Sequence, residues 1–313
     1  MTFVNGGPEF SPAKAPNTIA VVIPVYNGEN FIRRALDSVL GQTHRAAEII
    51  VVNDGSTDRT PEIVSEYGPA VTLLQQKNGG PSKARNAGVD ASTAQFVAFL
   101  DADDWWEPTK LEKQLKSFEA DPTAVLNYTA LRVVDAATGK HTDLSPPALD
   151  ILERQLRWMN RDMPPSCVMV RRAALKQIGG FNERLLAGED WYVWFSLRTA
   201  GSFCVCPEPL TDYRQSNVGQ SGNATFVFNE FLKMLDDVLL KDLSGIKRTI
   251  WRRKIMSFQA FMAVKTARGS GNRAEELRFV KMSLRTWPSP FWAPSRFKTF
   301  AVTLLRSAQS NRG

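Results

Sequence analysis

The feature that most constrains the fold is the alternation of short apolar runs with amphipathic segments over residues 19–120. The runs are rich in Val and Ile and show no polar alternation, which is typical of strands buried on both faces. The segments between them repeat apolar residues at helical spacing. Such units build a parallel sheet with helices on both faces. The predicted strands are 19–23, 48–53, 71–74 and 96–100, and the predicted helices are 31–40, 60–67, 82–91 and 108–120.

A polar cluster follows each predicted strand. The clusters are Tyr26-Asn27, Asp54-Gly55-Ser56, Asn78-Gly79-Gly80-Pro81 and Asp101-Ala102-Asp103. The carboxyl ends of parallel strands meet at one edge of the sheet, and ligands of such sheets bind there. The sequence therefore predicts one ligand site built from four strand ends.

Asp101 and Asp103 stand two residues apart where a strand ends. Side chains at this spacing share a face. Two carboxylates can bind a divalent cation that keeps its remaining positions for water and phosphate oxygens. Acidic pairs are also ordinary on solvated loops, so the metal–diphosphate interpretation depends on the other clusters.

The remaining clusters have ordinary explanations as well as functional ones. Asp54 could accept the ring N–H of a uracil or thymine, or only form an Asx-turn before a helix. Asn78-Gly79-Gly80 permits close approach of backbone to a ligand, and Arg85 could bind a base or a phosphate. Neither a Walker loop nor a Gly-x-Gly-x-x-Gly pattern follows the first strand, which disfavours ATPases and nicotinamide enzymes.

Four segments resemble, in order and spacing, the motifs of family 2 glycosyltransferases with the GT-A fold, and the resemblance covers roughly residues 18–215. The resemblance implies an α/β fold, with a Rossmann-like, mostly parallel sheet flanked by helices. The segments are Val22-Ile23-Pro24-Val25-Tyr26-Asn27-Gly28, Val52-Asn53-Asp54-Gly55-Ser56-Thr57-Asp58, Asn78-Gly79-Gly80-Pro81-Ser82-Lys83-Ala84-Arg85-Asn86-Ala87-Gly88 and Leu100-Asp101-Ala102-Asp103-Asp104-Trp105.

The resemblance implies roles at the matching positions. It implies a divalent metal, Mn²⁺ or Mg²⁺, at Asp103, and a nucleotide-sugar donor beside it. The residues implied to bind this donor are Pro24 and Tyr26 in the nucleotide pocket, Asp54 at the pyrimidine, Asn78 and Arg85 at the base, and Asp101 at the ribose side.

A second segment, Gly188-Glu189-Asp190-Trp191, opens a predicted helix over 191–200. Acidic residues at a helix start can simply complement the macrodipole. The resemblance instead implies that Asp190 is the general base, which removes the proton of an acceptor hydroxyl attacking the anomeric carbon. A base opposite the departing diphosphate predicts inversion of configuration.

The chain has two electrostatic halves. Residues 1–225 carry 22 Lys and Arg against 26 Asp and Glu, a net charge of −4, whereas residues 226–313 carry 17 against 6, or +11. We expect a flexible lead over 1–17, a GT-A domain over 18–225 and a basic, amphipathic helical region over 226–313. The basic region either contacts an anionic membrane surface or packs on the catalytic domain.

Composition narrows the chemistry and the location. Three cysteines without a Cys-x-x-Cys pair and two histidines favour neither a disulfide framework nor a zinc site. No apolar run approaches the ~20 residues that span a bilayer, and the amino-terminal stretch resembles no signal peptide. We expect a cytoplasmic protein, with a peripheral position on the cytoplasmic face of the membrane as a further option.

The sequence thus predicts an inverting, metal-dependent, hexosyltransferase-type enzyme. It would move a sugar from a nucleotide diphosphate donor, with UDP favoured, to a hydroxyl of a glycan, a lipid-linked glycan or a related polymer. Polysaccharide and cell-envelope biosynthesis is the expected context. The alternatives are a nucleotidyltransferase and a non-catalytic protein that binds glycans or polyanions, and nucleic acid is not favoured as a partner.

Overall fold

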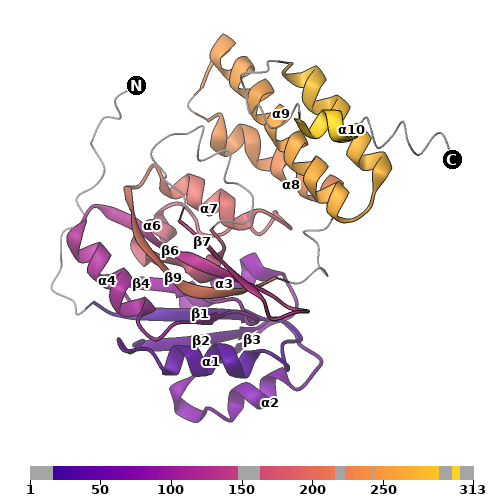
Figure 1. Ribbon diagram of the computed structural model, residues 1–313. Helices are drawn as coiled ribbons and strands as arrows, with labels where there is room; N and C mark the ends of the chain where they lie inside the picture. The colour runs from indigo at the N-terminus through magenta and orange to yellow at the C-terminus, as the bar shows by residue number, and fades with distance from the viewer. Residues whose placement is uncertain (1–16, 147–162, 216–222, 242, 289–297, 304–313) are drawn as a thin grey trace. The chain divides into compact units, whose positions relative to one another are not determined.

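The computed structural model describes residues 17–146, 163–215, 223–241, 243–288 and 298–303. The chain divides into two compact units, residues 1–216 and 217–313 (Figure 1). The predicted lead over 1–17 lies outside the described residues except for Asn17.

The first unit is built on a sheet of nine strands among the described residues. Its first half is parallel, as predicted, in the order β3-β2-β1-β4. β1 is central in this half and almost wholly buried, which explains its lack of polar alternation. These strands are β1 (Ile19–Val25), β2 (Glu48–Asn53), β3 (Thr72–Gln75) and β4 (Phe96–Phe99).

The second half of the sheet is mixed. β8 pairs antiparallel with both β4 and β6, and β6 then pairs parallel with the long β9. The expected α/β fold is confirmed, with the parallel arrangement confined to β1–β4 and the β6–β9 pair. The remaining strands are β5 (Trp105–Trp106), β6 (Ala124–Asp135), β7 (His141–Leu144), β8 (Val168–Arg171) and β9 (Ser202–Gln215).

Helices pack against both faces of the sheet, and β1 shows how its residues alternate between them. Val21 and Ile23 join a core with α1 and α4, whereas Val22 faces α3. A Cβ on Gly88 of α3 would lie 2.4 Å from Val22 Cγ1, so glycine permits this close approach. The helices of this unit are α1 (Ile32–Leu40), α2 (Thr60–Ser65), α3 (Pro81–Ala91), α4 (Lys110–Ala120), α6 (Arg172–Gln177) and α7 (Glu189–Leu197).

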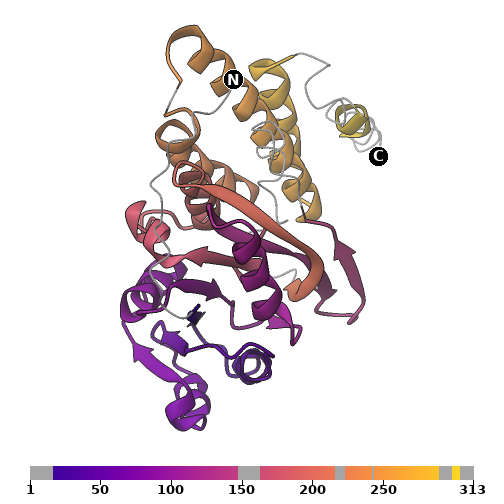
Figure 2. The same ribbon diagram turned by 90° about the vertical axis from the view of Figure 1, so that its left-hand side faces the viewer.

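The second unit is helical, as expected. It contains α8 (Ala224–Met234), a π-helical turn over Leu235–Leu239, α9 (Gly245–Gly269) and α10 (Arg273–Thr286). α9 and α10 lie side by side (Figures 1 and 2), with Phe279 and Val280 buried against the α9 residues Val264 and Ala267. In the described part of the chain, no helix is both long and apolar enough to cross a membrane.

Candidate active site

The loops after β1 and β2 are joined by side-chain hydrogen bonds. Asn27 has a left-handed backbone with a φ of 51°, and its Oδ1 accepts the Thr57 backbone N–H at 2.9 Å. The Asn27 N–H in turn donates to Ser56 Oγ at 2.9 Å. Beside them, Pro24 is half-buried near the end of β1 and Tyr26 is 53% exposed. An exposed aromatic ring at a strand end is available to a ligand.

Asp54 holds the glycine loop that precedes α3. Its side chain is buried, and Oδ1 accepts hydrogen bonds from Gly79 N at 2.8 Å and Gln76 Nε2 at 2.7 Å. Oδ2 accepts Gly80 N at 2.8 Å. Because a carboxylate oxygen has two lone pairs, Oδ2 retains one acceptor position. Asp54 therefore organises the loop, in which Asn78 is exposed.

Arg85, on α3, joins two acidic motifs. Its guanidinium is 4% exposed and donates to Asp101 Oδ1 at 2.7 Å and to Glu189 Oε1 at 2.9 Å. Burial alone would lower the pKa of Arg85, but the two carboxylates together raise it above its ordinary value. Its Nε has no hydrogen-bond partner among the described residues. The guanidinium is thus committed to holding α7 beside the end of β4.

Asp104 and Ser166 hold the segment around Asp101 and Asp103 in place through hydrogen bonds. The Ser166 hydroxyl donates to Asp104 Oδ2 at 2.5 Å and accepts the Asp101 N–H at 3.0 Å. Asp104 Oδ1 accepts the Arg214 N–H of β9 at 2.8 Å. Burial raises the pKa of Asp104 well above its usual range, and repulsion from Asp101 and Asp103 adds to the effect. Asp104 is therefore a structural carboxyl rather than a group facing solvent.

Asp103 is the most exposed carboxylate of the Asp101-Ala102-Asp103-Asp104 segment. Its side chain is 41% exposed, and Arg214 Nη1 lies 3.8 Å from its Oδ2, longer than a hydrogen bond. Burial and repulsion from Asp101 raise the pKa of Asp103. The Arg214 guanidinium also stacks 4.3 Å from the ring centre of Phe31. Among the described residues the Arg214 guanidinium makes no hydrogen bond, so its N–H donors are available beside Asp103.

Asp190 lies in the first turn of α7, after Gly188 with a φ of 76°. Burial and the neighbouring Glu189 raise the pKa of Asp190 to about 7, opposed by the Trp191 N–H and by Arg85. The Trp191 N–H donates to Asp190 Oδ1 at 2.8 Å. A carboxyl that titrates near neutrality can accept a proton during turnover.

The carboxylates fit a divalent cation only in part. No group of three or more His, Cys, Asp or Glu within the described ranges is arranged to hold a metal. Asp101 and Asp103 offer hard oxygen ligands. The two carboxylates repel each other, and a bound cation would relieve this repulsion. Mg²⁺ and Mn²⁺ suit such oxygen sites, where Mg²⁺ commonly takes one or two carboxylates with phosphate oxygens and water completing the shell. These residues therefore fit a metal that arrives with a diphosphate.

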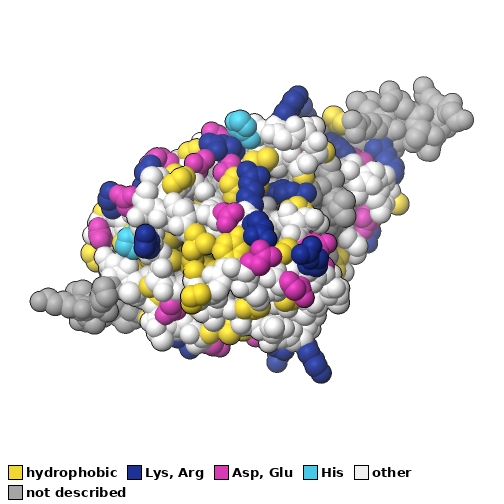
Figure 3. Space-filling model, turned by 90° about the horizontal axis from the view of Figure 1, so that it is seen from below, with side chains coloured by type: hydrophobic (Ala, Val, Ile, Leu, Met, Phe, Trp, Pro, Cys, Tyr) yellow, Lys and Arg dark blue, Asp and Glu magenta, His cyan; other side chains and the backbone are white. Residues whose placement is uncertain are grey.

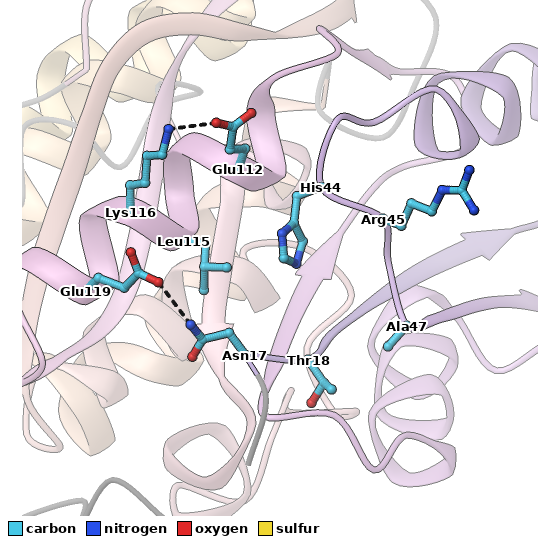
Figure 4. A pocket seen from close by; sticks show the side chains of 9 residues that line it. All are labelled: Asn17, Thr18, His44, Arg45, Ala47, Glu112, Leu115, Lys116 and Glu119. Carbon is cyan, nitrogen blue, oxygen red and sulfur yellow. Dashed lines mark hydrogen bonds and ion pairs between the residues drawn. The ribbon is translucent and has the colours of Figure 1, made fainter. Parts of the chain in front are cut away.

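A pocket at the opposite edge of the sheet is separate from this site. It lies between the amino-terminal ends of β1 and β2 and one side of α4, and is lined by Asn17, His44 and Glu119 among others (Figure 4). Within the pocket, Lys116 pairs with Glu112, and Asn17 Nδ2 donates to Glu119 Oε1 at 3.0 Å.

On the face of the molecule seen from below, acidic, basic and hydrophobic side chains are interspersed (Figure 3).

Comparison with known proteins decides the family. The model of glycosyl transferase family 2 matches residues 20–179. The chain belongs to this family. An uncharacterised glycosyltransferase of Rickettsia typhi is 29% identical over 228 residues, or 71% of this chain and 72% of the relative. A chondroitin synthase of Pasteurella multocida is 31% identical over 196 residues, or 59% of this chain but only 19% of that protein.

The fold agrees with a solved glycosyltransferase structure. The crystal structure of S. aureus TarS 1–349 in complex with UDP-GlcNAc matches with a TM-score of 0.58 at 17% identity, covering 86% of this chain and 89% of that one. The GT-A fold expected from the sequence is thereby confirmed.

The structure brings most of the predicted site residues to one edge of the first unit. Arg85, Asp101 and Glu189 are in direct contact, with Asp190 next to Glu189 and Asp103 beside Asp101. Sequence reasoning did not single out Gln76, Ser166 or Arg214. Their contacts join segments far apart in the chain, so no local pattern could reveal them.

Proposed function

We propose that this family 2 glycosyltransferase is an inverting, metal-dependent enzyme that transfers a hexose-type sugar from a UDP-sugar to a hydroxyl of a glycan or lipid-linked glycan. The observation that carries the proposal is the buried Arg85, bonded to Asp101 at one strand end and to Glu189 beside Asp190. This contact supports a single site in which a donor-binding acidic motif and a general base face the same reaction centre.

The residues divide the work of donor binding. We assign the pyrimidine edge to Asp54 Oδ2, the nucleotide pocket to Pro24 and Tyr26, and the base and ribose to the neighbourhood of Asn78, Arg85 and Asp101. The diphosphate would lie between Asp103 and Arg214, where the guanidinium supplies a cation. A divalent cation bound at Asp103 would stabilise negative charge on the departing diphosphate.

Asp190 completes the chemistry. Its carboxylate takes the proton of the acceptor hydroxyl while that oxygen forms a bond to the anomeric carbon. The bond from this carbon to the diphosphate oxygen breaks, and its electron pair leaves with the nucleoside diphosphate. Attack from the face opposite the leaving group inverts the configuration.

We also propose that residues 226–313 contact an anionic membrane surface, where a lipid-linked acceptor would reside, and that the enzyme works on its cytoplasmic face. The excess of eleven positive charges in this region supports the contact.

The experiment is a panel of nucleotide sugars tested for release of free nucleoside diphosphate, with Mn²⁺, with Mg²⁺ and with a chelator. We expect release from a UDP-sugar that requires the cation. Release that persists unchanged in chelator would contradict metal dependence, and no release from any nucleotide sugar, with a range of glycan acceptors, would contradict the proposed reaction.

A further inference from the structure

The first turns of α9 extend past the end of its partner helix. Ser257 Oγ donates to the Ser283 carbonyl at 2.7 Å, which fixes the register of α9 against α10. Only residues 284–286 of α10 follow Ser283, whereas residues 245–256 of α9 precede Ser257. Near the end of α10, Lys254 lies over the Trp287 ring, 5.5 Å from its centre. Residues 245–253, here called the projecting turns, reach beyond α10.

The projecting turns expose apolar side chains. Ile246 is 78% exposed, the largest exposed fraction among the large hydrophobic residues that the structure describes, and Ile250 is 38% exposed. Because they are four residues apart, the two side chains lie on the same side of the helix. The two isoleucines therefore form a small exposed apolar surface on one side of the projecting turns.

The charge around these isoleucines is positive. α9 contains seven Lys and Arg and no Asp or Glu, and four of the basic residues lie in the projecting turns. Arg248 and Arg252 pair with Asp236, at 3.1 and 3.4 Å. Among the described residues, no carboxylate lies within 4 Å of the charged groups of Lys247 or Arg253.

The positions of these two basic residues complete the pattern. At about 100° per residue, Lys247 and Arg253 fall on opposite sides of the isoleucine face. A cation near a helix amino terminus also opposes the helix dipole. Lys247, in the first turn of α9, therefore costs some stability in the free protein, which an anion outside the helix would offset.

We propose that the projecting turns of α9 are the element that docks on an anionic lipid bilayer. The isoleucines enter the boundary between headgroups and acyl chains, while Lys247 and Arg253 meet anionic headgroups on either side. Charge alone would suit a nucleic acid or another polyanion equally well. The paired isoleucines favour the bilayer, because only a bilayer offers an apolar layer beneath its anionic surface.

This docking rests on the proposed function for its purpose, which is to bring the first unit to a lipid-linked acceptor. Docking would precede the transfer reaction. It would therefore raise the rate at which the enzyme meets a membrane-bound acceptor, and it would not change the release of UDP from a UDP-sugar in solution.

The test measures binding of the full chain to vesicles of phosphatidylglycerol and phosphatidylcholine, with pure phosphatidylcholine as the neutral surface. Three double variants are compared: Lys247→Glu with Arg253→Glu, Ile246→Gln with Ile250→Gln, and the control Lys265→Glu with Lys281→Glu. The control changes two exposed lysines of α9 and α10, and alters net charge by the same amount as the first variant. Circular dichroism verifies that each variant keeps its helices.

We expect the wild type to bind anionic vesicles, less strongly as salt rises, and neutral vesicles poorly. The Lys247/Arg253 variant should lose roughly 25-fold in binding, from a factor of about five for each basic residue, and the control should lose much less. The isoleucine variant should lose vesicle binding while retaining its binding to heparin.

Three results would overturn the inference. The first is that the wild type does not bind anionic vesicles, and the second is that the control loses as much binding as the Lys247/Arg253 variant. The third is that the isoleucine variant binds vesicles normally, which would indicate general adhesion to polyanions such as RNA. Release of UDP from a UDP-sugar without vesicles is measured on the same samples. Vesicle binding without UDP release would contradict the proposed function alone, and UDP release without vesicle binding would contradict the docking alone.

Discussion

The two units of the chain place their charges differently. In the first unit, the titratable groups of Arg85, Asp104 and Asp190 are buried and are held by hydrogen bonds. In the second unit, Lys247 and Arg253 project from a helix into solvent. Buried, hydrogen-bonded charges fix geometry and respond little to salt, whereas exposed charges act over a Debye length of about 8–10 Å and weaken as salt rises.

This contrast teaches that net charge alone is a poor guide to function. The first unit is the less charged of the two overall, yet its carboxylates are the groups that we propose to react. Substitutions in the first unit should therefore change turnover at any salt concentration, and substitutions in the projecting turns should change only encounters with a charged surface.

The largest effect is expected from Asp190→Asn. The amide keeps the shape of the side chain and can still accept the Trp191 N–H, but it cannot take a proton. Turnover should fall ~10²–10⁴-fold, measured as UDP release in the presence of a saturating acceptor. Because burial raises the pKa of Asp190, its charged form is disfavoured by folding, and the variant should not lower the Tm. Turnover like that of the wild type would exclude Asp190 as the base.

The second-largest effect is expected from Asp103→Asn, which should reduce turnover ~10²–10³-fold. The variant loses an anionic ligand on a half-exposed side chain without disturbing the core. Calorimetry of UDP binding should show that Mn²⁺ no longer strengthens the affinity. Asp143→Asn, at an exposed carboxylate on β7, serves as the matched control. An unchanged response to Mn²⁺ would place the metal elsewhere.

Asp54→Ala should weaken UDP binding by roughly 1–3 kcal/mol, or about 5- to 150-fold. The variant removes the acceptor for the pyrimidine N–H and also frees Gly79 and Gly80. Gln76→Ala removes one contact to Asp54 Oδ1 and leaves the carboxylate in place, so it should weaken binding less. Equal losses in the two variants would assign the effect to the loop instead of to base recognition.

A smaller, graded effect is expected from pH. With a pKa of about 7, Asp190 is protonated and inactive as a base at lower pH, so kcat/KM should fall about tenfold per unit below neutrality. Glu189→Gln removes a like charge beside Asp190 and lowers its pKa. The fall of kcat/KM, called the acidic limb of the pH profile, should therefore move to lower pH. The control Glu62→Gln, an exposed residue of α2, should leave the limb in place. A profile that is flat between pH 6 and 8 would argue against Asp190.

The smallest effect is expected from Lys247→Glu with Arg253→Glu in solution. Without vesicles, UDP release should stay within about twofold of the wild type, as for surface substitutions away from a site. A large loss would show that the projecting turns serve the chemistry, and the contrast between the units would fail.

The parallel half of the fold could be predicted from the sequence because its signals are local. Buried runs such as β1 lack polar alternation, and polar clusters follow where the strands end. The insertion of β8 between β4 and β6 could not be predicted, because strand order depends on pairings between distant segments.

The site was predictable to a similar extent. The motifs identified candidate residues, and the structure places Arg85, Asp101 and the Glu189-Asp190 pair together. The partners of Arg85 were not evident, because one of them lies 104 residues later in the chain. Likewise Ser166 follows two prolines in an ordinary-looking loop, and only the fold shows that it supports Asp101 and Asp104.

The shared guanidinium of Arg85 also restricts how such a site can diverge. Replacing Asp101 or Glu189 alone leaves a buried positive charge with one partner, and replacing Arg85 leaves two carboxylates facing each other without a cation. Single substitutions at the three positions should therefore be strongly non-additive. In a lineage that changes its donor or its acceptor, these positions should be inherited as a block, and new specificity should arise at exposed neighbours such as Tyr26 and Asn78.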